Sequence, residues 1–293
     1  MIIPVILGPT CIGKTSLALE IAKEIGAEIL SIDSRQVFKD LDIGTGKYKG
    51  SAQISKKEGY WEVEGVKIWG YDFLYPNEEL NVLKFCEFAK KVILEAQKKN
   101  QKIIATCGTG FYLDFLRGEI KFSEIDELRK KELHQKSLAE LKEILFSIEV
   151  NTKVDTENKL RIITRILSLE SGSKKESFLI PGIEFKVFQL EAGRGELYSN
   201  ADEFATNILK NNIILEYESC FNKYGLVRSL EGLIYKEIGE FKAGRVLFLD
   251  LHDRIKFSLH SYIRRQQTFF KKMKKDYSTQ DRKELAEKIK EIF

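Results

Sequence analysis

The 293-residue sequence has no apolar run long enough to cross a membrane. Its N-terminal apolar stretch is short and stops after Leu7 at a glycine-rich segment. For the same reason we expect no signal peptide. The four cysteines, Cys11, Cys86, Cys107 and Cys220, show neither C-x-x-C nor paired spacing, which is typical of free thiols in a reducing compartment. These absences predict a cytoplasmic protein with no membrane association.

Histidine is scarce as well. His134, His252 and His260 stand apart from one another and from any cysteine, which argues against a zinc site. Hydrophobic residues make up 43% of the chain and charged residues 31%, as in an ordinary globular protein, and the net charge of +4 is mild. Basic residues nevertheless crowd one late segment: Arg264, Arg265, Lys271, Lys272, Lys274 and Lys275. This segment is either a solvated helix face or a contact surface for nucleic acid, and both alternatives stay open.

A phosphate-binding motif is the most informative feature present. Residues 8–15 match G-x-x-x-x-G-K-S/T, after an apolar run over 2–7 that predicts a buried strand and before a helical pattern over 17–25. This order aims backbone N–H groups and the positive end of a helix at an anion. Lys14 adds a mobile positive charge, and Thr15 a hydroxyl suited to a magnesium ion. We therefore assign diphosphate or triphosphate binding to Gly8, Pro9, Thr10, Cys11, Ile12, Gly13, Lys14 and Thr15.

The remaining pattern predicts an α/β fold. Strand-like runs at 28–32, 102–107 and 184–190 alternate with helical stretches, which is typical of a parallel sheet covered by helices on both faces. We predict a P-loop NTPase-like parallel sheet flanked by helices, with a helical insertion and a helical C-terminal part. The expected domains are a catalytic core of residues 1–120 and 183–293 and an insertion of residues 121–182.

A carboxylate stands at the end of the second expected strand. Asp33 follows the apolar run 28–32, and open α/β sheets bind ligands at the carboxyl ends of their strands. The structural alternative is that Asp33 caps the next turn. Asp250 ends another apolar run, 246–249, and imitates a magnesium motif of nucleotide hydrolases. The absence of a loop and helix signature after it disfavours that interpretation.

Four blocks of sequence carry a family resemblance. They are the phosphate loop, residues 32–38 (Ile-Asp-Ser-Arg-Gln-Val-Phe) with 42–45 (Asp-Ile-Gly-Thr), residues 108–113 (Gly-Thr-Gly-Phe-Tyr-Leu) and residues 262–269 (Tyr-Ile-Arg-Arg-Gln-Gln-Thr-Phe). The D-S-x-Q and D-I-G-T pair is much more specific than the phosphate loop. Together the blocks resemble the tRNA dimethylallyltransferases. The resemblance implies transfer of a dimethylallyl group from its diphosphate to the exocyclic amine of the adenosine 3′-adjacent to the anticodon.

The resemblance also implies roles for individual residues. Asp33 matches the family's general base, which takes a proton from a weakly nucleophilic arylamine, and Thr109 would lie beside the reacting centre. Lys14, the loop amides and Mg²⁺ on Thr15 would stabilise the departing diphosphate. The implied catalytic residues are Asp33, Thr109 and Lys14. The implied contacts to the tRNA anticodon stem-loop are Asp33, Ser34, Arg35, Gln36, Thr109, Arg161, Arg165, Arg264, Arg265 and Gln266. We further expect a monomer.

Some positions depart from the family pattern. The helix expected at 197–211 lacks the arginine that members usually carry near the diphosphate, and Phe204 lies near the expected place. Ile234 replaces a glycine usual before Tyr235. Another cation should then approach the diphosphate, and Arg228 is our candidate. Two other classes stay open: a P-loop nucleotide or nucleoside kinase, which would use ATP, and a non-catalytic RNA-binding NTPase.

Overall fold

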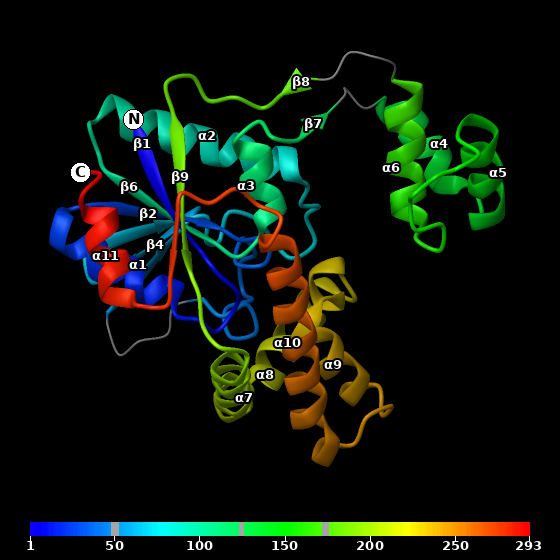
Figure 1. Cartoon of the computed structure of the whole chain (residues 1–293). Helices are drawn as coiled ribbons and strands as arrows, with labels where there is room; N and C mark the ends of the chain where they lie inside the picture. The colour runs from blue at the N-terminus through cyan, green and yellow to red at the C-terminus, as the bar shows by residue number, and fades with distance from the viewer. Residues whose placement is uncertain (48–52, 123–125, 172–175) are drawn as a thin grey trace. The chain divides into compact units, whose positions relative to one another are not determined.

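The computed structural model describes residues 1–47, 53–122, 126–171 and 176–293. These residues divide into two compact units (Figure 1). The first comprises residues 1–116 and 180–293, and the second comprises residues 117–179. The second unit therefore interrupts the first in sequence, and we describe each by itself.

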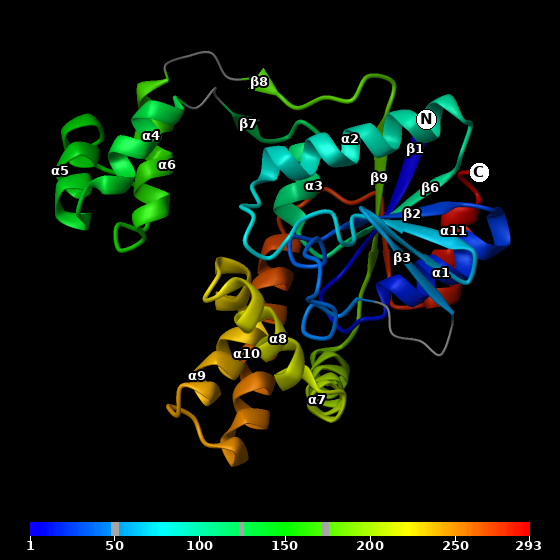
Figure 2. The same cartoon turned by 180° about the vertical axis from the view of Figure 1, so that it is seen from behind.

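The first unit is built on a sheet in which the described residues form eight strands, in the order β10-β9-β1-β6-β2-β5-β4-β3 (Figures 1 and 2). The strands from β10 to β5 are parallel, and β4 and β3 continue the sheet antiparallel. The predicted parallel α/β fold is confirmed. The strands are β1 (Ile2–Leu7), β2 (Glu28–Ile32), β3 (Ile54–Lys57), β4 (Tyr60–Val63), β5 (Val66–Trp69), β6 (Ile103–Cys107), β9 (Glu184–Leu190) and β10 (Tyr277–Thr279).

Helices cover both faces of this sheet because successive crossovers run in opposite directions. Helix α1 (Lys14–Ile25) leads from β1 to β2, and α2 (Val82–Lys98) leads back from β5 to β6. Right-handed crossovers of opposite direction place their helices on opposite faces. Helix α3 (Gly110–Leu116) packs beside α2, and α11 (Arg282–Lys290) packs beside α1 (Figures 1 and 2).

The register of the central strands brings three loops to one edge of the sheet. Leu7 of β1 pairs with Cys107 of β6, and Cys107 pairs with Ile32 of β2. All three residues are fully buried. The chain therefore leaves the three parallel strands at the same level, and the segments that follow them meet at the carboxyl edge of the sheet, where ligands of open α/β sheets bind.

The first unit continues in helices: α7 (Arg194–Lys210), α8 (Ile213–Tyr224), the 3₁₀ helix η1 (Arg228–Glu231), α9 (Leu233–Lys242) and α10 (Phe248–Phe270). Helix α10 packs against α7 and α9. The apolar run at 246–250 is not a strand, because Leu247 caps α10 and Leu249 in its first turn is 89% exposed. Asp250 is therefore a first-turn helix residue, and the magnesium-motif interpretation of it is wrong.

The second unit contains the short strands β7 (Lys121–Phe122) and β8 (Glu176–Ser177) and the helices α4 (Glu127–Gln135), α5 (Leu138–Ile148) and α6 (Lys159–Glu170). Its own core is formed by Leu133, Leu141, Leu145, Ile162, Ile163, Ile166 and Leu167. Ser137 and Glu140 form a capping box that fixes the start of α5. No helix among the described residues of either unit is long and apolar enough to cross a membrane.

Candidate active site

The phosphate loop connects β1 to α1 without a side-chain cap. Gly13 caps α1 with a φ of 88°, a left-handed conformation that favours glycine. The first N–H groups of a helix have no acceptor within it, so this end of α1 can bind an anion. Lys14 folds back over the loop and donates a hydrogen bond from Nζ to the carbonyl of Pro9 at 2.8 Å. Burial lowers the pKa of Lys14, and the nearby Asp33 carboxylate offsets part of that shift.

A pocket of about 480 Å³ opens beside the loop. Gly13, Lys14 and Thr15 line one part of it, so the Thr15 side chain lies where it could hold a metal ion. Asp33 and Gly108 reach the same pocket from the ends of β2 and β6. The remaining wall includes an apolar group contributed mostly by the later helices: Ile43, Phe204, Ile208, Leu233, Ile234 and Leu259.

The two carboxylate oxygens of Asp33 have different surroundings. Oδ1 accepts hydrogen bonds from the backbone N–H groups of Arg35 at 2.7 Å and Gln36 at 3.3 Å, so Asp33 does cap the turn that follows β2. Oδ2 has no hydrogen-bond partner among the described residues, and a Cβ on Gly108 would lie 2.8 Å from it. Gly108 therefore leaves room for Oδ2. The turn orients the carboxylate while its second oxygen can accept a proton.

Ser34 and Thr109 lie together. The Oγ1 of Thr109 accepts a hydrogen bond from the Ser34 N–H at 3.1 Å and lies 3.4 Å from the Ser34 hydroxyl. Neither lines the pocket beside the phosphate loop. Ser34 instead lines a second pocket of about 540 Å³, which shares Arg35 and Gly232 with the first.

Gln36 and Arg35 are held by internal contacts. The Gln36 amide donates to the carbonyls of Thr45 and Gly46 and accepts from the Ser31 hydroxyl. The guanidinium of Arg35 donates to carbonyls of the segment around η1, Ser229 at 2.6 Å and Gly232 at 3.4 Å. Burial lowers the pKa of Arg35. Both side chains join the end of β2 to neighbouring loops.

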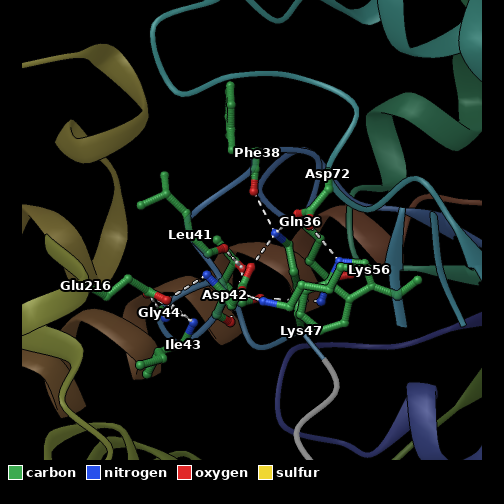
Figure 3. A network of polar contacts seen from close by, with 12 residues as sticks. Gln36, Phe38, Leu41, Asp42, Ile43, Gly44, Lys47, Lys56, Asp72 and Glu216 are labelled. Atoms are coloured by element: carbon green, nitrogen blue, oxygen red, sulfur yellow. Dashed lines mark hydrogen bonds and ion pairs between the residues drawn. The ribbon is translucent and has the colours of Figure 1, made fainter. Parts of the chain in front are cut away.

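The loop of residues 41–47 forms part of the pocket and is held by a network that sequence reasoning missed (Figure 3). Glu216 of α8 accepts hydrogen bonds from the backbone N–H groups of Asp42, Ile43 and Gly44 at 2.8–3.1 Å. The Tyr235 hydroxyl donates to the same carboxylate at 2.6 Å. Three successive amides turned toward one carboxylate form an anion-binding nest, which here is filled from within the protein.

A buried ion cluster closes the other end of this loop (Figure 3). The Lys47 side chain is fully buried and donates to the Phe38 carbonyl at 2.6 Å, to Asp42 at 2.7 Å and to Asp72. Lys56 pairs with the second oxygen of Asp42. Burial raises the pKa of Asp42, but the two lysines lower it more, so the net shift is downward. The D-I-G-T motif marks the loop in the sequence, but no motif marks these distant partners.

Gln266 connects the phosphate loop to β6. Its Oε1 accepts from the Thr10 N–H at 2.9 Å, its Nε2 donates to the Gly108 carbonyl at 2.8 Å, and the residue is 6% exposed. Asn200 of α7 also supports the loop by donating to the Cys11 carbonyl. Arg264 and Arg265, the neighbours of Gln266 in α10, are exposed. Only Gln266 of the three lines the pocket.

The remaining predicted basic residues lie elsewhere. Arg228 lines the second pocket and not the first, whereas Phe204 lines the first. In the second unit, Arg161 of α6 pairs with Asp155 at 3.3 Å. Arg165 donates from Nε to Glu149 at 2.8 Å. The hydrogen bonds that Glu149 accepts from Arg165 and Thr152 lower its pKa to about 2. The contact of Arg161 and Arg165 with RNA stays a prediction.

One pocket is lined by the phosphate loop, by Thr15 at the start of its helix and by Asp33 at the end of β2, two strands away in the sheet. This combination defines an enzyme site of the P-loop class. Residues 36–273 match the family model described as IPP transferase, and residues 1–61 match the one described as isopentenyl transferase. The chain belongs to the IPP transferase family, which is the tRNA dimethylallyltransferase family that its motifs resemble.

Known relatives agree with this assignment. The chain is 32% identical to the tRNA dimethylallyltransferase of Clostridioides difficile, over 93% of this chain and 90% of the relative. It is 30% identical to the one from Caldanaerobacter subterraneus, over 92% and 88%. These matches favour the transferase over the kinase alternative.

Solved structures of this type share the fold. A tRNA isopentenylpyrophosphate transferase from Staphylococcus epidermidis superposes with a TM-score of 0.70 at 25% identity, covering 99% of this chain and 97% of that one. A eukaryotic dimethylallyltransferase acting on tRNA gives a TM-score of 0.70 at 17% identity, over 93% and 70% of the two chains, and so supports the fold alone.

Proposed function

We propose that this enzyme transfers the dimethylallyl group of dimethylallyl diphosphate to the exocyclic amine of the adenosine 3′-adjacent to the anticodon of certain tRNAs. The observation that carries the proposal is the single pocket shared by the phosphate loop and the Asp33 carboxylate, in a chain of this family. A diphosphate on the loop would place its prenyl carbon within the pocket, where a carboxylate can serve the incoming amine.

The donor diphosphate would lie on the loop. The N–H groups at the start of α1 and the Lys14 ammonium bind it and stabilise the charge that grows as the bond between carbon and oxygen breaks. The five-carbon chain then lies against the apolar wall, of which Phe204, Ile208 and Leu259 are part. A phenyl ring at position 204 suits this wall better than a diphosphate contact.

Magnesium fits this donor site. Mg²⁺ keeps several waters and is usually bound by one or two protein groups together with substrate phosphates. The described residues contain no cluster of three or more His, Cys, Asp or Glu side chains able to hold a metal by themselves. Thr15 is one of the residues that line the pocket, and its hydroxyl would hold the ion. When bound, the ion would help neutralise the diphosphate.

The acceptor amine would meet Asp33. An exocyclic amine conjugated with its ring is a weak nucleophile, so loss of its proton must accompany attack on the prenyl carbon. The new bond forms between nitrogen and carbon, the bond to the diphosphate oxygen breaks, and Oδ2 of Asp33 takes the proton. Oδ1 stays with the turn, which keeps the base oriented. Ser34 follows Asp33 in the sequence, and Thr109 is hydrogen-bonded to Ser34. Both residues would contact the adenine ring of the acceptor.

The tRNA contacts are proposed for basic residues at the surface, of which Arg161, Arg264 and Arg265 are exposed and Arg165 is half-buried. Arg264 and Arg265 on α10, and Arg161 and Arg165 on α6 of the second unit, would bind the phosphate backbone, which supplies most of the affinity for a nucleic acid. The target base is stacked in its loop and must be splayed out to reach Asp33. A cytoplasmic monomer is our prediction for the working state of the enzyme.

Isothermal titration of the full chain tests the donor assignment. In the presence of magnesium we expect dimethylallyl diphosphate to bind and to be displaced by inorganic diphosphate, and we expect Lys14→Ala to weaken both. Tight binding of ATP that excludes dimethylallyl diphosphate would contradict the proposal and support the kinase.

A further inference from the structure

The last helix of the chain packs directly against the helix of the phosphate loop. The family match ends at residue 273, so β10 and α11 lie beyond it, and no motif in the sequence assigns them a role. They are nevertheless well anchored. β10 pairs with β9, while Leu285 and Ile289 of α11 are fully buried. Lys290 at the far end of α11 pairs with Glu24 of α1.

Arg282, the first residue of α11, reaches the phosphate loop itself. Its Nη1 donates to the carbonyl of Gly13 at 3.1 Å, and its Nη2 lies 3.3 Å from both the Ser16 hydroxyl and the Glu20 carboxylate. The approach is close, because a Cβ on residue 13 would lie 2.5 Å from Nη1. Gly13 is favoured by its positive φ, and a side chain there would also displace the Arg282 guanidinium from its present position.

The contact acts on the peptide group between Gly13 and Lys14. In a trans peptide the carbonyl and the N–H lie in one plane and point in opposite directions. The Gly13 carbonyl also accepts from the N–H of Leu17 at 3.1 Å and from the Ser16 hydroxyl at 2.9 Å. With three donors holding the carbonyl along α1, the Lys14 N–H must point out of the helix end, toward a bound anion.

The guanidinium charge adds to this geometry. A positive group on a carbonyl polarises the peptide and makes its N–H a stronger donor, as happens in any chain of linked hydrogen bonds. Arg282 is not among the residues that line the pocket, so it would act on a ligand through the loop. We propose that Arg282 is a positioning residue for diphosphate, which strengthens binding through the Gly13–Lys14 peptide.

Inorganic diphosphate with magnesium is the probe, and titration calorimetry of the full chain is the measurement. We expect Arg282→Ala to weaken the binding of inorganic diphosphate to the enzyme about tenfold, which is the loss typical of one charged hydrogen bond. Arg282→Lys should weaken this binding less. Lys290→Ala is the matched control, because it removes the other ion pair between α11 and α1 without touching the loop. It should bind diphosphate as the parent does.

Kinetics separate positioning from a purely structural role. Arg282→Ala should raise KM for dimethylallyl diphosphate and leave KM for an anticodon stem-loop unchanged. Normal diphosphate binding by Arg282→Ala, or an equal loss in Lys290→Ala, would overturn the proposal. If Arg282→Ala does not fold, Arg282→Lys must bind diphosphate more tightly than Arg282→Gln, and equal affinities would overturn it.

The proposal rests on the proposed function only in taking a diphosphate as the ligand. A parent enzyme that binds inorganic diphosphate but transfers no prenyl group would contradict the proposed function. The calorimetric comparison of the Arg282 variants would still decide the role of Arg282.

Discussion

At the residue scale, the surroundings of Asp33 are compatible with both roles that the sequence left open. Its Oδ1 caps the turn after β2, and its Oδ2 would be the proton acceptor in the proposed reaction. The strand and motif around it were predictable, because both are local patterns. The different surroundings of its two oxygens were not predictable, because they depend on Gly108. This glycine follows a strand 75 residues later in the chain and leaves space beside Oδ2.

Asp33→Asn separates the chemical role from the structural one. Asparagine keeps the oxygen that caps the turn but cannot take a proton, so we expect the rate of transfer to fall about a hundredfold or more. Binding of tRNA should change far less, because backbone contacts elsewhere dominate it. Single-turnover transfer and equilibrium binding, measured on the same variant, check this. Near-normal transfer would leave Asp33 as a turn-capping residue only.

Lys14 gives a pH-dependence of donor binding. Because burial lowers its pKa, Lys14 loses its proton at a lower pH than an exposed lysine would. The protonated form binds diphosphate, so affinity should be full below this lowered pKa and fall as the pH rises through it. Lys14→Arg keeps its charge over the same range. The ratio of the two affinities for inorganic diphosphate, measured across alkaline pH, should change, and a constant ratio would contradict the assignment.

At the element scale, the loop of residues 41–47 shows where sequence reasoning stops. Its D-I-G-T motif indicated importance, but its stability depends on Glu216, Tyr235 and Asp72, which come from other elements. A carboxylate in a helix 172 residues later leaves no local signal of the amide it accepts from. The Tyr235 ring explains why residue 44 is a glycine, since a Cβ there would lie 2.6 Å from the ring.

Glu216→Ala tests whether this loop is held from α8. Removal of the carboxylate leaves three partly buried amides without their acceptor, which should lower the free energy of unfolding by about 1–3 kcal/mol. Dimethylallyl diphosphate should also bind more weakly, because the loop forms part of its pocket. Urea unfolding measures the first effect and calorimetry the second. The control is Glu218→Ala, a change in the same helix as Glu216 that removes a surface ion pair with Lys242 of α9. Equal effects of the two variants would contradict the account.

Helix α10 carries a prediction about salt. Arg265 is exposed with its guanidinium 5.7 Å from the Tyr262 ring centroid, and Lys271 follows the end of the helix, also exposed. If both contact RNA phosphates, the double variant Arg265→Ala, Lys271→Ala should bind tRNA more weakly and with a salt dependence flatter by about one counterion per contact. Diphosphate binding should not change. An unchanged salt slope would return these residues to an ordinary solvated helix face.

At the scale of the whole molecule, the sequence predicted the sheet better than its edges. The buried strands β1, β2, β6 and β9 are apolar runs that any periodicity analysis detects. Strand β3 reads Ile-Ser-Lys-Lys and is largely exposed, so only its pairing with β4 makes it a strand. Strand β10 and helix α11 likewise owe their places to contacts with β9 and α1. Such elements depend on tertiary structure, which a local pattern does not contain.

The insertion was visible as a change of composition. Charged helical sequence begins after residue 123, and the contacts delimit the second unit at residues 117–179, against the 121–182 expected from the sequence. Its core is independent, with Leu133, Leu141 and Ile162 fully buried. The ion pairs of Arg161 and Arg165 were not predictable from helical spacing, because their partners, Asp155 and Glu149, precede the helix that carries the two arginines.

Transfer of label is the most direct test of the central claim. The full chain would be incubated with magnesium, dimethylallyl diphosphate labelled in the prenyl group and an anticodon stem-loop with adenosine after the anticodon, in the absence of ATP. We predict that the label appears on the exocyclic amine of that adenosine and that one diphosphate is released per group transferred. No transfer under these conditions would contradict the account, and movement of the terminal phosphate of ATP to a nucleotide acceptor in a parallel reaction with ATP would support the kinase instead.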